Sequence, residues 1–436
     1  MAVLPENPEG LDLEDFVAAH LAARGMFVET GVTERNPRSI LELDVVWTDY
    51  AAERPKRRPV EVKSGGWGLS DFFKFNGWTH YLGLEGGSFV FRHLGDEVTA
   101  PLIQCIAERC GINAIHLKDL AAAGGALAPM GIPEAADAGT VEIWRYSFLL
   151  QRRLIMSLGA AIRGGVCPES AKKAKDFFKL VNDAAFFEPD VRTRVEMMFN
   201  AHMSHRLLGA SAAGETAGLG VNFEQPPETP LFKAALYDGA HFPVQCCLFL
   251  GHRGRLAVLK AAVDCVLDKA AGQLPPKVIK VLGVAVDLAE SELTRGFRKA
   301  VEVLPCYPTF KRYPVFWQTF LWAWGGFILE DRKEQEYAAL SAQTGVPMGE
   351  IDQALGIFDL LFPYPAGWIV TPANTVRRGL KLMPAALRGL GAHLRLQMYG
   401  VKNYDTFGAG GLTSHHMALD NNAAVRLLGA DDQLVK

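Results

Sequence analysis

The chain has 436 residues and a formal net charge of −3, and 49% of its residues are hydrophobic and 21% charged. This composition is that of an ordinary globular protein and excludes a disordered or fibrous chain, while the length predicts two or three domains. Because the net charge is close to zero, any binding of nucleic acid has to depend on local surfaces.

The cysteines and the apolar segments favour a soluble, cytoplasmic protein. The 7 cysteines include no Cys-x-x-Cys pair, which is more typical of reduced thiols than of a disulfide framework or a zinc site. The segment MAVLPENPEG lacks the basic and apolar regions of a signal peptide. The membrane-like run over residues 313–329 contains Gln318 and is followed by Glu330 and Asp331, so we expect a buried helix and no membrane partner.

Residues 1–120 alternate helical and strand patterns. The first helix is expected from Asp12 to about Arg24, with Gly25 as its stop. Strands are expected over 26–33, 40–49, 59–63, 88–91 and 112–117, and further helices over 70–82 and 101–110. This order predicts an α/β domain in which helices flank a mixed sheet.

The rest of the chain is expected to be mainly helical. Residues 121–142 are small and rich in Gly and Pro, which predicts a linker. A helical domain is expected over 143–210 and a helical C-terminal domain over 229–436. Within the latter, residues 337–402 show a helix, a turn at Gly345 and a helix opened by Pro347, an order similar to a winged helix-turn-helix and equally common in ordinary helical domains.

Four polar residues of the first domain are expected to meet. Side chains alternate along a strand, so Glu61 and Lys63 share one face, and Asp44 lies on the polar face of the preceding strand. If residues 51–57 form the hairpin loop, Asp44 falls opposite Lys63, with Glu61 diagonal to it. Glu14 lies at the edge of the apolar stripe of the first helix and faces the sheet, whereas Asp12 and Asp15 point away from it.

This combination suits hydrolysis of a phosphodiester. Asp44 and Glu61, with the carbonyl of Val62, are suitable ligands for Mg²⁺ or Mn²⁺, and Lys63 can stabilise developing negative charge. Glu14 can complete the shell. Each residue alone is readily explained as a solvated surface charge; carboxylates and a lysine within otherwise apolar strands favour a catalytic set.

The order of Glu14, LELD ending at Asp44, and EVK at 61–63 resembles the PD-(D/E)XK nuclease superfamily of restriction-endonuclease-like enzymes, which includes Mrr-like and Holliday-junction-resolvase-like members. The resemblance covers about residues 11–120. It implies a restriction-endonuclease-like fold, metal ligation by Asp44 and Glu61, a catalytic Lys63 and an accessory Glu14. Leu43 stands where the motif carries proline, and the following helix lacks the Gln-x-x-x-Tyr pair of one branch.

Contacts to nucleic acid are expected from basic residues outside this set. The first 120 residues carry 12 Lys and Arg against 18 Asp and Glu, a net charge of −6, so other surfaces have to help hold a polyanion. The candidates lie at the predicted hairpin tip and in a C-terminal stretch: Lys56, Arg57, Arg58, Arg377, Arg378 and Lys381. Both groups can equally be solvated loop residues.

Two further patterns are expected to be structural. The aromatic residues Trp67, Phe72, Phe73 and Trp78 have the irregular spacing of core packing, although aromatic rings can also stack on bases. The pair of histidines at 202 and 205 has no evident third metal ligand.

The sequence thus predicts a metal-dependent endonuclease or exonuclease, with DNA as the expected substrate and defence against foreign DNA as a role suggested by analogy. The helical C-terminal region would serve recognition, or assembly with a partner protein or as a homo-oligomer. Two alternatives remain at this point: a catalytically silent DNA-binding or scaffold protein, and an RNA nuclease of a toxin-like system.

Overall fold

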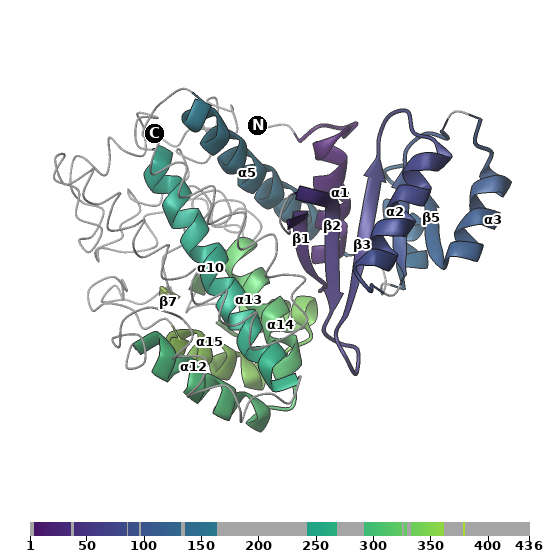
Figure 1. Ribbon diagram of the computed structural model, residues 1–436. Helices are drawn as coiled ribbons and strands as arrows, with labels where there is room; N and C mark the ends of the chain where they lie inside the picture. Colours follow the sequence, from purple (N-terminus) through teal and green to yellow (C-terminus); the bar gives the residue numbers. More distant parts are fainter. Residues whose placement is uncertain are drawn as a thin grey trace. The chain divides into compact units, whose positions relative to one another are not determined.

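The computed structural model describes residues 4–35, 39–84, 86–95, 97–131, 136–163, 242–267, 292–324, 327–328, 333–361 and 378–379. These residues fall into two compact units, one ending at Phe148 and the other beginning at Leu149 (Figure 1). The boundary therefore lies beyond the predicted end of the first domain at residue 120.

The N-terminal unit contains a five-stranded mixed sheet with flanking helices, as the sequence predicted. The strands follow the order β1-β2-β3-β4-β5; the first three are antiparallel, and β3, β4 and β5 are parallel. The elements are α1 (Leu11–Ala22), β1 (Phe27–Arg35), β2 (Ser39–Asp49), β3 (Lys56–Lys63), α2 (Leu69–Tyr81), β4 (Gly87–Phe91), α3 (Ala100–Cys110) and β5 (Ile112–His116).

Local signals explain why these elements begin and end where they do. Thr99 accepts a hydrogen bond from the Leu102 N–H at the start of α3, and Gly111 ends that helix in the left-handed conformation with φ +67°. The crossovers β3-α2-β4 and β4-α3-β5 join parallel strands, which requires a helix between them. Helices α2 and α3 therefore pack on the sheet around a core that includes Phe89 and Phe91 of β4.

The predicted linker is wrong in its first half. Helix α4 (Ala123–Ala126) and the 3₁₀ helix η1 (Ala128–Met130) follow β5, and Leu127 and Met130 are fully buried. The Gly124 carbonyl accepts a hydrogen bond of 2.6 Å from Arg24. Composition suggested a flexible connection, but small residues also suit close packing, and this segment belongs to the N-terminal unit.

Helix α5 (Ala138–Arg163) begins in the N-terminal unit, and its residue Arg145 contacts α1. The Arg145 guanidinium lies 5.1 Å from the ring centroid of Phe16 and donates a hydrogen bond to the Pro5 carbonyl. Asp15 is only 7% exposed, so the prediction that it points into solvent is wrong. The helical wheel took into account only the packing of α1 against the sheet, whereas Arg145 of α5 also lies near Phe16 and Asp15.

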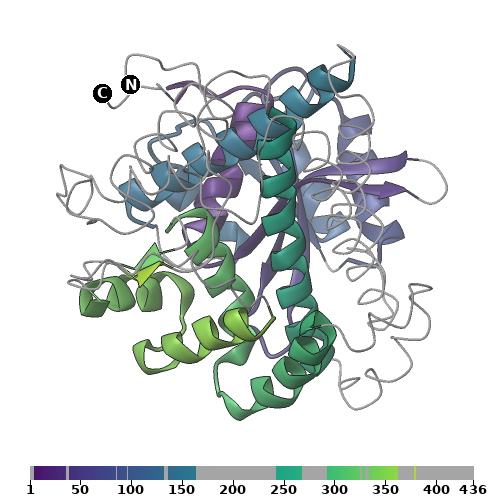
Figure 2. The ribbon, with the colours of Figure 1, turned by 90° about the vertical axis from the view of Figure 1, so that its left-hand side faces the viewer.

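The described part of the C-terminal unit is largely helical, as predicted. Its long helix α10 packs against α12 and α13 (the teal helix in Figure 2). The elements are α10 (Phe242–Leu267), α12 (Glu292–Val303), η3 (Leu304–Cys306), η4 (Phe310–Arg312), α13 (Tyr313–Trp322), β6 (Phe327–Ile328), α14 (Lys333–Thr344), η6 (Met348–Glu350), α15 (Ile351–Leu361) and β7 (Arg378–Gly379).

The apolar run of the C-terminal unit forms a buried helix, as predicted. Every residue of α13 is buried, and the Trp317 indole N–H donates to the Ala354 carbonyl at 2.9 Å. Among the described helices, none has the length and apolar character needed to cross a bilayer. The expected helix, Gly turn and helix are also present, since Gly345 with φ +72° separates α14 from η6 and α15. Of the predicted third part, 362–402, only β7 lies within the described residues.

His20 gives the N-terminal unit an acid-sensitive position. Burial, followed by the charges of Arg24 and Arg145, lowers the pKa of His20 to about 4. The unfolded chain therefore binds one more proton than the folded chain between about pH 6.5 and 4, so stability falls as the pH falls through this range. We expect His20→Gln to remove about 2 kcal/mol of this acid-induced loss. Urea unfolding from pH 7.5 to 4.5 measures it, and His80→Gln, at an exposed position of α2, is the control that should leave the pH dependence unchanged.

Candidate active site

Asp44 is held at the point where the pairing of β2 with β3 ends. The last paired residues are Val45 and Val60. One residue before Val45, the Asp44 carboxylate accepts a hydrogen bond of 2.7 Å from the Val62 N–H through Oδ2. The side chain thus takes the place of a main-chain partner and fixes its carboxylate beside the end of β3.

The register of this hairpin differs from the predicted one by two residues. If the pairing of Val45 with Val60 is extended by one residue, Asp44 lies opposite Glu61. The sequence predicted that Asp44 would lie opposite Lys63. The reason is the turn: pairing continues to Asp49 and Lys56, so residues 50–55 form the connection in place of the expected 51–57. A shift of two residues keeps every side chain on its face, so the predicted shared face is retained.

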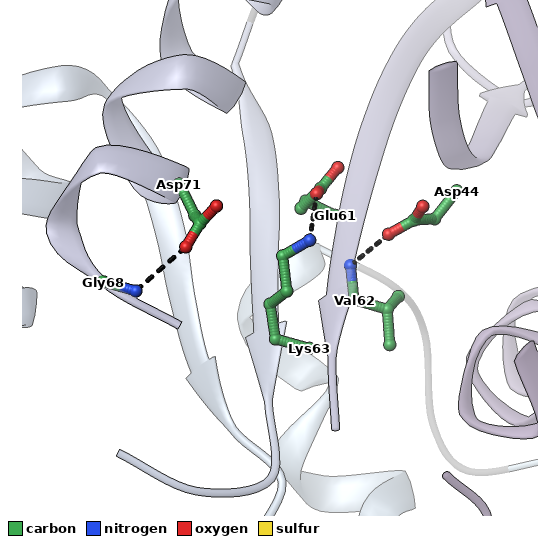
Figure 3. A network of polar contacts seen from close by, with 6 residues as sticks. All are labelled: Asp44, Glu61, Val62, Lys63, Gly68 and Asp71. Carbon is green, nitrogen blue, oxygen red and sulfur yellow. Dashed lines mark hydrogen bonds and ion pairs between the residues drawn. The ribbon is translucent and has the colours of Figure 1, made fainter. Parts of the chain in front are cut away.

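Glu61 and Lys63 form an ion pair on this face. The Lys63 Nζ lies 2.6 Å from the Glu61 Oε1, and the Glu61 residue is only 6% exposed. Glu61 stands beside Phe89, and Lys63 beside Phe91, in the parallel pairing of β3 with β4. Figure 3 shows the ion pair with Asp44 on one side of it. The polar group is therefore embedded next to the aromatic core of the sheet.

One oxygen of this group has no protein partner. The Glu61 Oε2 is buried and accepts no hydrogen bond from any residue that the structure describes. A buried carboxylate oxygen without a donor costs on the order of 1–3 kcal/mol. A cation bound there would remove this cost.

Burial and mutual repulsion change the acidity of the carboxylates. Burial, followed by the negative charges of Glu61 and Glu14, raises the pKa of Asp44 to about 8. Burial likewise raises the pKa of Glu61, although the hydrogen bond and charge of Lys63 oppose this. At neutral pH the Asp44 carboxyl is therefore mostly protonated, and Glu61 is the carboxylate that pairs with Lys63.

Lys63 keeps its proton. Burial alone lowers the pKa of an ammonium group, but the hydrogen bond to Glu61 and the charges of the surrounding carboxylates outweigh it, so the pKa of Lys63 lies above its ordinary value. At neutral pH the side chain is a hydrogen-bond donor and a positive charge. It does not act as a base.

Glu14 approaches the group from α1. It is half-buried, and its charge acts on Asp44. The start of α1 is tied to the end of β3, because the Gly10 N–H donates a hydrogen bond of 2.7 Å to the Ser64 Oγ. The four predicted residues thus lie near one another, and among the other three it is Asp44 whose pKa the charge of Glu14 raises.

The sequence reasoning missed two residues of α2. Asp71 accepts a hydrogen bond of 2.9 Å from the Gly68 N–H, and its charge acts on both Glu61 and Lys63; in Figure 3 it lies on the other side of the ion pair from Asp44. The charge of Lys74 acts on Glu61. An acid at the third position of a helix that starts shortly after Lys63 was the signal for Asp71.

The predicted basic hairpin tip is wrong. Lys56, Arg57 and Arg58 are the first residues of β3 and lie outside the turn. Arg58 lies 5.5 Å from the ring centroid of Trp47 and donates a hydrogen bond to the Met130 carbonyl. Strand β3 begins three residues earlier than its apolar pattern indicated. The long side chain of an arginine can pack on a sheet while its charge stays near the surface.

The other expected nucleic-acid contacts are mostly outside the described residues. Residues 377 and 381 are among those outside, as are the histidines at 202 and 205, and of Arg378 only the backbone in β7 is described. The aromatic prediction is confirmed for Trp67 and Phe72, which are buried in the core at 4% and 0% exposure. It is wrong for Phe73, which is 51% exposed.

The donor set fits a hard divalent cation. Within the described part of the chain, no three Asp, Glu, His or Cys side chains form a metal-binding group by themselves. Mg²⁺, however, keeps several waters and takes only one or two carboxylates from a protein. Asp44, Glu61 and the Val62 carbonyl supply that number of oxygens, and the partnerless Glu61 Oε2 is a suitable ligand atom.

Comparisons of this chain with models of known protein families, with curated proteins and with solved structures found no match.

Proposed function

We propose that the N-terminal unit is a metal-dependent nuclease of the PD-(D/E)XK type that hydrolyses phosphodiester bonds. The observation that supports this best is the group of Asp44, Glu61 and Lys63, which places two carboxyl groups and a protonated lysine together and includes the buried Glu61 Oε2 that accepts no hydrogen bond from the described residues. Structural ion pairs usually balance their charges. Here the group holds a second carboxyl besides the Glu61–Lys63 pair, that of Asp44, whose ionised form is disfavoured by its surroundings. A bound cation would offset this cost.

Asp44, Glu61 and the Val62 carbonyl would hold Mg²⁺ or Mn²⁺. When bound, the ion would lower the pKa of a water molecule and offset the charge of the phosphate. The hydrogen bond from the Val62 N–H fixes the orientation of the Asp44 carboxylate, so little ordering would remain to be done at binding.

Lys63 would act on the phosphate and on the attacking water. Hydrolysis forms a bond from the water oxygen to phosphorus and breaks the bond to the ester oxygen, while the attacking water gives up a proton to bulk water and the leaving oxygen takes one from it. Negative charge grows on the phosphoryl oxygens. The Lys63 ammonium stabilises this charge because it remains protonated at neutral pH. Glu14 would complete the shell of the ion from α1, and DNA is the substrate that the superfamily resemblance implies.

A cleavage assay with the full chain tests this proposal. Supercoiled plasmid, linear duplex, single-stranded DNA and RNA are each incubated with Mg²⁺, with Mn²⁺ and with EDTA. We expect DNA to be cleaved with either metal and to remain intact in EDTA. Cleavage of RNA alone would indicate a ribonuclease, and binding of DNA without cleavage under either metal would indicate a silent scaffold; both results contradict the proposal.

A further inference from the structure

The outward side of α2 carries two exposed aromatic rings. Phe73 is 51% exposed and Tyr81 is 60% exposed, and every other Phe, Tyr or Trp side chain that the structure describes is more buried. The two residues are eight positions apart on one helix, which corresponds to about 12 Å along its axis. Exposed aromatic residues are common singly, but two along one helix form an apolar surface that needs a reason.

The helix surface between the two rings is open. Gly77 lies midway between them, and a Cβ added there would meet no atom within 4 Å. Glycine inside a helix costs about 1 kcal/mol relative to alanine, so an absent side chain here has a cost without a packing benefit. The exposed Lys74 stands on the same side, with its Nζ 4.4 Å from the ring centroid of Trp78.

This surface, the α2 platform of Phe73, Lys74, Gly77 and Tyr81, begins next to the candidate active site. Helix α2 starts at Leu69, shortly after Lys63. The charge of Lys74 already acts on Glu61. A polymer that lies along the platform would therefore reach the acidic group at one end of it.

We propose that the α2 platform binds single-stranded nucleic acid, with bases stacked on Phe73 and Tyr81 and a phosphate beside Lys74. Only unpaired bases offer free faces to exposed rings, since bases in a duplex stack on one another. Asp71, the one acidic residue of α2, is turned to the Gly68 N–H and the active-site group. Stacking also suits a domain with net negative charge, because it needs few phosphate contacts.

The delivery of a strand to the active site rests on the proposed nuclease function, whereas the binding itself does not. Binding is therefore measured in EDTA, where no cleavage is expected. The fluorescence anisotropy of a labelled oligothymidylate, a strand without base pairs, is recorded with the full chain. We expect Phe73→Ala and Tyr81→Ala each to raise the Kd about tenfold, the usual effect of losing one stacked base.

Three matched variants separate stacking from general apolar contact. Phe73→Trp should bind like wild type and Phe73→Leu like Phe73→Ala, because leucine is apolar but offers no ring. Leu102→Ala removes an apolar side chain of 40% exposure from α3 and should leave the Kd unchanged. Gly77→Gln should keep the helix folded, since glutamine is the better helix former, and weaken binding by covering the surface.

The outcomes distinguish the two proposals. Ring-dependent binding in EDTA without any cleavage in Mg²⁺ supports the platform and contradicts the nuclease. Cleavage of DNA with an unchanged Kd in Phe73→Ala, Tyr81→Ala and Gly77→Gln overturns the platform alone. The platform is also overturned if Phe73→Leu binds the oligothymidylate with the Kd of the wild type. It is likewise overturned if light scattering shows that Phe73→Ala converts a dimer to a monomer while the Kd for the oligothymidylate stays unchanged.

Discussion

Replacement of Lys63 by methionine is expected to lower the rate of metal-dependent DNA cleavage by about 10²- to 10³-fold, the usual cost of one removed charge-stabilising donor. Methionine has a similar length and no charge, so the shape of the group is kept. The effect should appear in the rate at saturating DNA and hardly in the Kd, because the ammonium is needed most as charge develops on the phosphate. Single-turnover cleavage of a labelled duplex measures the rate.

Lys118→Met is the matched control, because Lys118 is an exposed lysine of the same unit. This variant should cleave DNA as fast as the wild type. Circular dichroism and thermal melting must show that Lys63→Met is folded. A folded Lys63→Met protein that cleaves as fast as wild type would remove the lysine from the proposed mechanism.

Asp44→Asn is expected to abolish cleavage and, in EDTA, to make the protein more stable by about 1–3 kcal/mol at pH 8. The asparagine oxygen can still accept the hydrogen bond from the Val62 N–H and carries no charge. Because the pKa of Asp44 is raised to about 8, the folded state binds more protons than the unfolded state between about pH 4 and 8. Stability of the wild type is therefore lost as the pH rises through this window, and the gain in Asp44→Asn grows with it.

Mg²⁺ is expected to reverse the order of stability of the wild type and Asp44→Asn. Ligand at 100 times its Kd stabilises a protein by about 2.7 kcal/mol, so Mg²⁺ should raise the melting temperature of the wild type and leave Asp44→Asn nearly unchanged. Glu42→Gln, an exposed acid on the same strand, is the control and should respond to Mg²⁺ as the wild type does. Equal stabilisation of the wild type and Asp44→Asn by Mg²⁺ would place the ion elsewhere.

The order of helices and strands from α1 to β5 could be predicted from the sequence because its signals are local, whereas α4 and η1 were missed. Apolar residues at helical spacing, alternation in the strands and turn residues such as Gly25 and Gly111 need no knowledge of distant contacts. The same alternation put Glu61 and Lys63 on one face of β3, since the period of a strand is two residues whatever its partner.

The precise partners within the site could not be predicted. Which residue of β3 stands beside Asp44 depends on the length of the turn, and the sequence does not state where strand pairing stops when arginines replace apolar residues. The role of Asp71 likewise depends on how α2 lies across the sheet. The neighbour of Asp44 on β3 and the position of Asp71 both follow from the tertiary arrangement of the sheet and α2.

The sequence by itself determined the order of elements and the residue types available for chemistry. Only the tertiary structure decided which side chains water can reach. Phe72 and Phe73 are neighbours in the chain, yet one is in the core and the other at the surface, because α2 rests on β4 with a single face. Asp15 is buried although the helical wheel turns it away from the sheet, and its charge acts on Arg145 of α5. Burial is a property of the elements that surround a residue, and a local pattern contains no information about how many of them there are.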